Sequence, residues 1–164
     1  LKKMHRIYTK EEYFEKVASL KEIVPGVALG TDMIVGFPTE TQEMFQDTLD
    51  LVQICDLTYV HVFPYSKRTG TPAARMPQVK GDIIKVRAQE LRALGDIQKQ
   101  KFFKGQVGQI LPVVIEANNR GHTPHFAPCS IEGDTAPLLG QVQWVKINGV
   151  GENHLLASLV NRGD

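Results

Sequence analysis

Residues 31–41 constrain the fold of this chain more than any other stretch of its 164 residues. An apolar, β-branched run ends at Gly36, a Phe-Pro pair turns the chain, and a helix follows. We call residues 36–41 the corner. Two carboxylates, Asp32 and Glu40, flank the turn. Ligands of α/β proteins bind beyond the carboxyl ends of the strands, so the sequence predicts a small-molecule site here.

Helical and strand patterns alternate around the corner. A capping box at Thr9 and Glu12 starts a helix that Pro25-Gly26 ends. The strand before the corner covers residues 27–35, and its composition predicts burial on both faces, as in a parallel sheet. A helix follows the corner, and the further elements are a buried strand over residues 59–65, an extended loop over residues 66–78 and a long helix over residues 82–103. Strand, helix and strand in this order predict a right-handed βαβ unit and therefore an α/β fold.

The pattern changes after Lys104. Four short β-like runs separated by turn residues follow, at residues 109–117, 122–131, 141–147 and 154–160. A tail of this size with four or five strands is too small for a sandwich and favours a small all-β barrel of the OB type. We therefore expect two domains, residues 1–104 and residues 105–164.

Composition excludes several classes of protein. The formal charge of +1 and the pI near 8.0 give no global nucleic-acid signature. Cys55 and Cys129 fit neither a disulfide framework nor a C-x-x-C metal site, and they suit a reducing compartment. The five histidines show no zinc spacing. No apolar run approaches a membrane span and no signal peptide opens the chain, so we expect a soluble, cytoplasmic protein without a membrane partner.

Each candidate residue of the corner has a structural and a functional interpretation. Asp32 is either satisfied by neighbouring backbone amides or accepts hydrogen bonds from ligand hydroxyls or amines. Glu40 has a similar pair of interpretations: it either gains stability from the helix dipole in the first turn without any function, or it accepts hydrogen bonds from a ligand. Gly36 permits the close approach of a ligand to the backbone. An aromatic and a hydroxyl at residues 65–66, followed by two cations, could hold a nucleoside and its phosphates, or they could be an aromatic lid and a solvated loop.

Several separated motifs occur in the order found in the radical S-adenosylmethionine methylthiotransferases. The sequence resembles this family over nearly its whole length, and the tail resembles its TRAM domain. The motifs are Leu1-Lys2-Lys3-Met4-His5-Arg6, Asp32-x-Ile34-Val35-Gly36-Phe37-Pro38-x-Glu40-Thr41, Val62-Phe63-Pro64-Tyr65-Ser66 and Arg68-x-Gly70-Thr71-Pro72-Ala73-Ala74. Within the family, residues 61–66 are most similar to the enzymes that methylthiolate threonylcarbamoyladenosine in tRNA.

The resemblance implies the rear part of a partial (β/α) barrel, then a TRAM barrel, in an enzyme that uses S-adenosylmethionine and a four-iron cluster. A 5′-deoxyadenosyl radical would abstract hydrogen from C2 of the modified adenosine, and a methylthio group would be installed there. The implied cofactor-binding residues are Thr31, Asp32, Ile34, Gly36, Glu40, Val62, Phe63, Tyr65 and Ser66. The implied partner is tRNA, with Lys67, Arg68, Lys101, Lys104, Arg120 and Lys146 as RNA-binding residues.

One family feature is missing from the chain. The C-x-x-x-C-x-x-C motif that binds the cluster is absent, so the sequence holds no catalytic or metal-binding residues of its own. We interpret it as the C-terminal portion of a longer enzyme, inactive alone. The alternatives are a methylthiotransferase for another modified adenosine or a ribosomal protein, and a non-catalytic RNA-binding module.

Two further expectations concern partners. From Lys104 onward four Lys or Arg face five acidic residues, so RNA binding would rely on shape and on stacking against Trp144 or Phe126 rather than on bulk charge. Half a barrel also exposes a sheet edge, which predicts self-association of this chain. A clean monomer in light scattering at high concentration would contradict that prediction.

Overall fold

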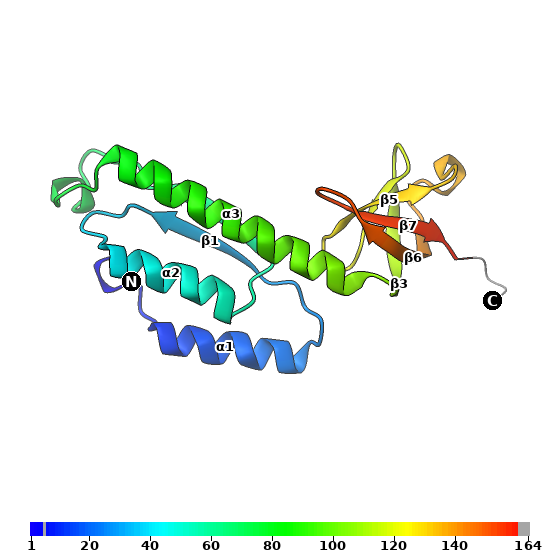
Figure 1. The fold of residues 1–164 in the computed structure, drawn as a ribbon, viewed down its shortest axis with the longest axis horizontal. Coiled ribbons are helices and arrows are strands. Elements are labelled where there is room, and N and C mark those ends of the chain that lie inside the picture. Colours follow the sequence, from blue (N-terminus) through cyan, green and yellow to red (C-terminus); the bar gives the residue numbers. More distant parts are fainter. Residues whose placement is uncertain (5, 161–164) are drawn as a thin grey trace. The chain divides into compact units, whose positions relative to one another are not determined.

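The computed structural model describes residues 1–4 and 6–160, which form two compact units, Leu1–Gln98 and Lys99–Asp164 (Figure 1). A long helix, α3 (Gly81–Gln106), supplies residues to both units. The division falls inside this helix because Phe102 and Phe103 pack with the barrel core. The domain boundary near Lys104 that the sequence suggests stays a prediction.

The first unit is mixed α/β. Its elements are α1 (Lys10–Ile23), β1 (Gly30–Val35), α2 (Gln42–Ile54), β2 (Tyr59–Pro64), most of α3, and two 3-10 turns at Lys2–Met4 and Ala73–Arg75. The predicted capping box is confirmed, since Thr9 Oγ1 accepts from the Glu12 amide at 3.1 Å and Glu12 Oε2 accepts from the Thr9 amide at 2.7 Å. α2 lies between β1 and β2 in the sequence. The two strands pair with each other in parallel, as expected for a βαβ unit.

The sheet of this unit is covered on one face only. Val35, Met33 and Val62 pack against the apolar stripes of the helices, which contribute Val17, Phe45, Leu49, Val52, Ala88 and Leu91 to the core. The opposite face carries Asp32 beside His61 and Ile34 beside Phe63, and these four side chains are exposed. The predicted burial on both faces is therefore wrong for β1, and the predicted buried strand over residues 59–65 is wrong as well, because among the described residues the helices cover only one face of the sheet. β1 also begins later than predicted, at Gly30.

The second unit is a closed five-stranded barrel. Its strands are β3 (Ile110–Glu116), β4 (Arg120–His122), β5 (Pro128–Glu132), β6 (Val142–Val150) and β7 (Leu155–Leu159), with a 3-10 turn at Ala136–Leu138. They pair in the order β3-β4-β5-β7-β6, with β5 and β7 parallel. Among the described residues, ten buried side chains fill the barrel, namely Phe103, Val113, Ile115, Ala127, Cys129, Ile131, Val145, Ile147, Leu155 and Ala157. The predicted small barrel is confirmed.

One predicted strand is wrong. Residues 122–131 do not form a single strand, because a tight turn separates β4 from β5. Thr123 Oγ1 accepts hydrogen bonds from the amides of His125 and Ala127, and Phe126 adopts a positive φ of 56°. The buried Thr123 hydroxyl satisfies two amides that a continuous strand would have placed in a ladder.

No helix in the described part of the chain combines the length and the apolar sequence that crossing a bilayer requires.

Candidate functional site

The corner holds two residues in the left-handed region of backbone conformation. Gly36 has φ 73°, and a Cβ built on it would lie 2.4 Å from Cγ1 of Ile84. Thr39 has φ 70°, which is an outlier for a β-branched residue. Its amide donates to Pro77 O at 3.1 Å, so the loop after β2 holds it in place. Strained backbone conformations of this kind are common at binding sites, where packing and hydrogen bonds of the surrounding structure stabilise them.

The Glu40 carboxylate is hydrogen-bonded within the corner and to α3. Its Oε2 accepts from the Gly36 amide at 3.1 Å, and its Oε1 accepts from Nη1 of Arg87 at 2.6 Å. Only 10% of the Glu40 side chain and 7% of the Arg87 side chain are exposed. Glu40 therefore closes the corner on itself and ties it to α3.

Arg87 was not identified from the sequence. Its guanidinium also donates to Gln42 Oε1 at 3.3 Å and lies 5.3 Å from the centroid of the Phe45 ring. Arg87 could have been recognised from its position next to Ala88 and Leu91 on the apolar side of α3. A cation on a buried helix face requires a hydrogen-bonding or charged partner.

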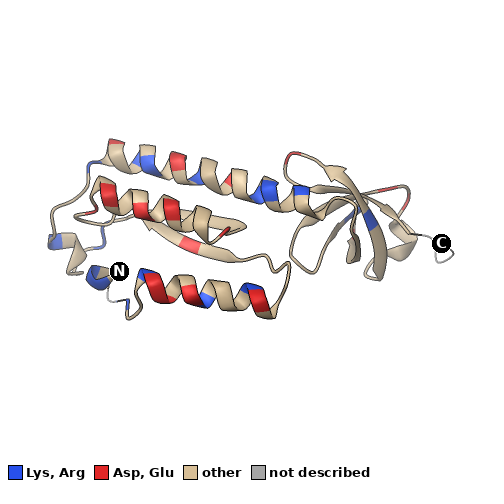
Figure 2. Cartoon of the chain, turned by 60° about the horizontal axis from the view of Figure 1, so that its bottom comes forward, with Lys and Arg blue, Asp and Glu red and all other residues tan. Residues whose placement is uncertain are grey.

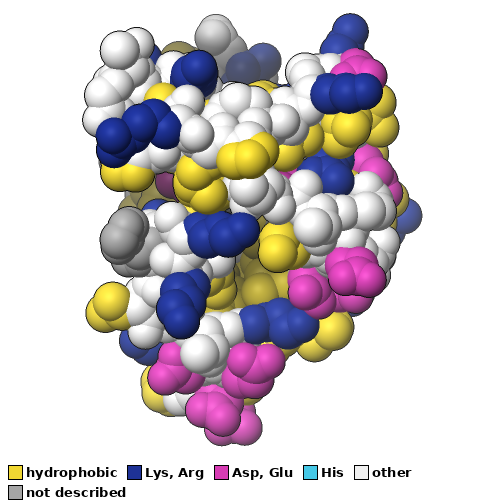
Figure 3. All heavy atoms as spheres, turned by 90° about the vertical axis from the view of Figure 1, so that its left-hand side faces the viewer, with side chains coloured by type: hydrophobic (Ala, Val, Ile, Leu, Met, Phe, Trp, Pro, Cys, Tyr) yellow, Lys and Arg dark blue, Asp and Glu magenta, His cyan; other side chains and the backbone are white. Residues whose placement is uncertain are grey.

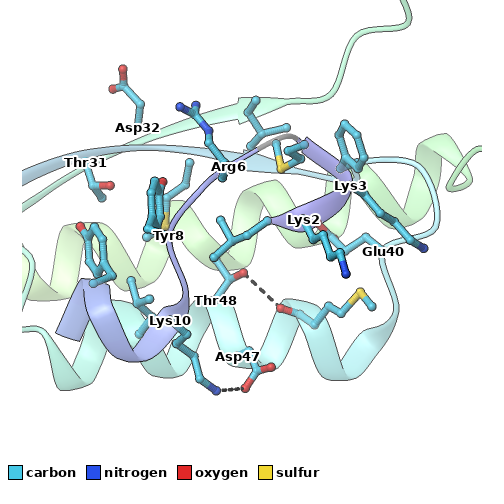
Figure 4. A pocket seen from close by; sticks show the side chains of 18 of the residues that line it. Lys2, Lys3, Arg6, Tyr8, Lys10, Thr31, Asp32, Glu40, Asp47 and Thr48 are labelled. Atoms are coloured by element: carbon cyan, nitrogen blue, oxygen red, sulfur yellow. Dashed lines mark hydrogen bonds and ion pairs between the residues drawn. The ribbon is translucent and has the colours of Figure 1, made fainter. Parts of the chain in front are cut away.

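A cavity of about 610 Å³ lies beside the corner (Figure 4). It brings together four of the predicted cofactor-binding residues, Thr31, Asp32, Ile34 and Glu40, along with residues of the first ten positions and of α2. Thr31 and Asp32 project to opposite sides of β1 (Figure 4). Gly36 supports the corner without lining the cavity.

Several basic side chains that were not predicted as binding residues border the cavity. Lys2, Lys3, Arg6 and Lys10 line it. Lys3 Nζ donates to Thr39 Oγ1 at 2.7 Å, and the hydrogen bond from Lys10 to Asp47, at 2.8 Å, raises the pKa of that lysine. Figure 3 shows this end of the unit with blue Lys and Arg side chains set around recessed hydrophobic ones.

The second predicted motif lies beside the corner but divides between two faces. The Tyr65 amide donates to Val35 O at 2.8 Å, and its ring packs edge-on against Phe37 at 5.5 Å between centroids. Phe63 lies next to Ile34 on the open face, where 52% and 41% of these residues are exposed. Val62 packs toward the helices, and Ser66 is exposed beyond the end of β2.

The predicted RNA-binding cations divide between the two units. Lys67 and Arg68 are exposed on the loop after β2 in the first unit. In the second unit Lys101 and Lys104 lie on the end of α3, Arg120 on β4 and Lys146 on β6, all exposed. Figure 2 shows Lys and Arg in blue and Asp and Glu in red, with both signs of charge along the helices.

The two cysteines are packing residues. Each is buried in the core of its own unit, and burial raises the pKa of Cys55 and raises that of Cys129 to about 11. Cys129 Sγ donates to Gly121 O at 3.3 Å. Among the described residues no group of three His, Cys, Asp or Glu side chains could hold a metal ion.

We expect neither cysteine to react with a thiol reagent at mildly alkaline pH while the protein is folded, because the reactive thiolate is both scarce and inaccessible. Both should react after unfolding in guanidinium chloride. A Ser66→Cys variant places a thiol at an exposed position and should label rapidly as a matched control. Rapid labelling of the unsubstituted folded chain would contradict the packing described for both cores.

Comparison with known proteins identifies the class that this arrangement belongs to. The chain, an α/β unit followed by a small β-barrel, belongs to the methylthiotransferase family. A search of protein-family models gives no match.

Three curated relatives illustrate the similarity. The chain is 44% identical over 160 residues to the threonylcarbamoyladenosine tRNA methylthiotransferase MtaB of Rickettsia prowazekii, an alignment that covers 98% of the chain and 38% of that protein. It is 44% identical over 167 residues to the tRNA-2-methylthio-N(6)-dimethylallyladenosine synthase of Protochlamydia amoebophila, covering 97% of the chain and 37% of the relative. The MtaB of Bacillus subtilis is 35% identical over 161 residues, covering 92% and 36%. The chain thus spans little more than a third of the length of these relatives.

Proposed function

We propose that this chain is the C-terminal part of an enzyme that adds a methylthio group to C2 of threonylcarbamoyladenosine in tRNA by radical S-adenosylmethionine chemistry. One observation carries the proposal. The chain is 44% identical to such an enzyme. The parallel register places Asp32 beside His61 and Ile34 beside Phe63 on the open face of the sheet, next to the corner.

The first unit would be the rear part of a partial (β/α) barrel. In such barrels alternate strand residues face the interior and the others face the surrounding helices. β1 and β2 have this division, with Met33 and Val62 toward the helices and Ile34 and Phe63 away from them. The five-stranded barrel of the second unit would be the TRAM domain.

The residues present fit S-adenosylmethionine in part. Ile34 and Phe63 offer apolar contact for an adenine ring, and Asp32 offers an acceptor for hydroxyls or an amine. The buried hydroxyl of Tyr65 has no hydrogen-bond partner among the described residues, and a polar ligand atom would satisfy it. When bound, the cofactor would supply the radical chemistry. Glu40 and Val62 would act by shaping the corner and the strand, since the Glu40 carboxylate is hydrogen-bonded within the corner and Val62 packs toward the helices.

An iron-sulfur cluster does not fit the described residues. Clusters are held by several cysteine thiolates, and here Cys55 and Cys129 are buried singly with raised pKa values. We therefore assign no step of the reaction to a cluster ligand in this part of the chain.

The partner would be tRNA. Lys67 and Arg68 could steer its phosphates in the first unit, and Lys101, Lys104, Arg120 and Lys146 could do so in the second. Within the described residues both outer edges of the two-stranded sheet are unpaired, which supports the proposed self-association of this chain on its own.

The experiment expresses the full-length protein in a strain that lacks its own methylthiotransferases and analyses its tRNA nucleosides by mass spectrometry. We expect the methylthiolated form of threonylcarbamoyladenosine to appear. If only dimethylallyladenosine were methylthiolated, the substrate would instead be the nucleoside named for the second relative. If no new methylthiolated nucleoside appeared, the proposal would be overturned. A strain carrying the empty vector is the control.

A further inference from the structure

The cavity beside the corner has the size and the lining of a small-molecule site. Its volume of about 610 Å³ lies within the range of about 300–1,000 Å³ that ligand pockets occupy. Met33, Phe37 and Leu51 contribute apolar surface to its wall. Asp32 and Ile34 also line it, and both lie on the open face of the sheet. The cavity therefore reaches the face on which the cofactor is proposed to bind.

Positive charge exceeds negative charge in this cavity. Among the described residues it is lined by four basic side chains, Lys2, Lys3, Arg6 and Lys10, and by three acidic ones, Asp32, Glu40 and Asp47. Two of these acids are already paired. Glu40 lies 2.6 Å from Arg87, and Asp47 lies 2.8 Å from Lys10. The remaining cations outnumber the remaining acid, which favours an anionic ligand.

Arg6 and Lys2 are the two lining cations that are free to bind such a ligand. Lys3 donates to Thr39 Oγ1 at 2.7 Å, and Lys10 is held by its ion pair. The side chains of Arg6 and Lys2 are exposed, and they form no hydrogen bond or ion pair with the part of the chain that the structure describes.

Arg6 is the better placed of the two. Its amide donates to Leu1 O at 3.1 Å, so a turn fixes its backbone. Figure 4 shows its side chain on the side of the cavity toward β1, whereas Lys10 turns away toward Asp47. A planar guanidinium can donate two parallel hydrogen bonds to a carboxylate, which an ammonium group cannot do. Arg6 thus offers a carboxylate site next to the open face of the sheet.

We propose that Arg6, assisted by Lys2, binds the carboxylate of the threonylcarbamoyl group of the substrate nucleoside and so selects this nucleoside over dimethylallyladenosine. The inference rests on the proposed function and names the group that recognises its substrate. A threonylcarbamoyl group carries a carboxylate, whereas a dimethylallyl group is uncharged and apolar. A cation that must give up water without gaining this carboxylate disfavours the second substrate. The chain is 44% identical to relatives named for each nucleoside, so overall identity does not separate the two.

Two other anions share this chemistry, the carboxylate of S-adenosylmethionine and a phosphate of RNA. The carboxylate of S-adenosylmethionine stands beside an ammonium group, which an excess of cations repels, whereas the nitrogen atoms of the threonylcarbamoyl group are uncharged. A backbone phosphate has no apolar part to cover Met33, Phe37 and Leu51. The methyl group of the threonyl side chain can do so.

The test measures binding of the full-length protein to anticodon stem-loop RNAs of one sequence that differ only in the modified adenosine. The three forms carry threonylcarbamoyladenosine, its methyl ester and dimethylallyladenosine. The ester nearly preserves the shape of the group and removes its charge. We expect the unsubstituted protein to bind the acid at least about tenfold more tightly than the ester, as for hydrogen bonds to a charged group. Arg6→Gln should abolish this preference, and Arg6→Lys should retain part of it.

Lys16→Gln is the matched control, because Lys16 is an exposed cation of α1 that does not line the cavity. It should leave all three affinities unchanged. Equal loss of affinity for the three RNAs in Arg6→Gln would assign Arg6 to a phosphate, and a rise confined to the KM for S-adenosylmethionine would assign it to the cofactor. Either result would overturn the proposal, and so would an unchanged preference of Arg6→Gln for the acid.

The nucleoside analysis described above is independent of these affinities. If it showed methylthiolated threonylcarbamoyladenosine while Arg6→Gln still preferred the acid to the ester, only the role of Arg6 would be wrong. If it showed no such product, the proposed function would fail whatever the affinities were.

Discussion

Replacement of Arg87 by methionine should lower the stability of the first unit by about 3–5 kcal/mol, the usual cost of leaving one member of a buried ion pair alone. The variant strands the Glu40 carboxylate, which is almost fully buried and loses its 2.6 Å contact with Nη1. Methionine preserves most of the volume beside Phe45, so the effect measures the lost charge and hydrogen bonds rather than a cavity. The measurement is urea unfolding followed by circular dichroism, which reports mainly the helices.

Lys85→Met is the matched control for this prediction. It removes a cation from the same helix at an exposed position and should change stability by less than about 0.5 kcal/mol. The double variant Arg87→Met, Glu40→Met removes both charges and should recover part of the loss, although the Gly36 amide then lacks its acceptor. Equal stability of Arg87→Met and Lys85→Met would show that the pair does not hold the corner.

Gly36→Ala is expected to cost about 2–4 kcal/mol for two separate reasons. The left-handed conformation at φ 73° costs an alanine about 1 kcal/mol or more. The new methyl group would also lie 2.4, 2.8 and 3.0 Å from Cγ1, Cδ1 and Cγ2 of Ile84. Overpacking a core in this way costs about 1–3 kcal/mol. The loss should appear in the same unfolding experiment.

Gly26→Ala separates these two contributions. Gly26 has nearly the same positive φ, 78°, but no atom within 4 Å of the position of a Cβ. Its alanine variant should show only the backbone cost of about 1 kcal/mol. Adding Ile84→Val to Gly36→Ala should restore part of the difference by removing the Cδ1 atom. If the two glycine variants lost equal stability, steric contact with α3 would not be what makes Gly36 necessary.

The elements were largely predictable because their signals are local. The capping box at Thr9, the parallel βαβ unit and the small barrel all follow from spacing and turn residues within short windows. The exception within the barrel is the turn after Thr123. Pro124 signals a break there, but the two hydrogen bonds to the threonine hydroxyl that fix the turn depend on burial of that side chain.

The position of the corner was predictable from the sequence, but the directions of its neighbouring side chains were not. The end of β1 identifies the corner, yet which side of a strand faces the helices depends on how many layers cover the sheet. Val62 and Phe63 are adjacent in sequence and face opposite ways. The partner of Glu40 lies 47 residues away, so no local pattern could have assigned it.

The helix α3 has a consequence for moving the barrel into other proteins. Its final turns belong to the Lys99–Asp164 unit, because Phe103 fills the barrel core and Gln100 donates to Gly151 O at 3.3 Å. A graft that begins at β3 would lack Phe103, so the core of the barrel would be incomplete and one end of it would be open to solvent. The smallest transplantable module therefore starts inside the helix, at Lys99, and a fusion partner must itself end in a helix that can continue into it.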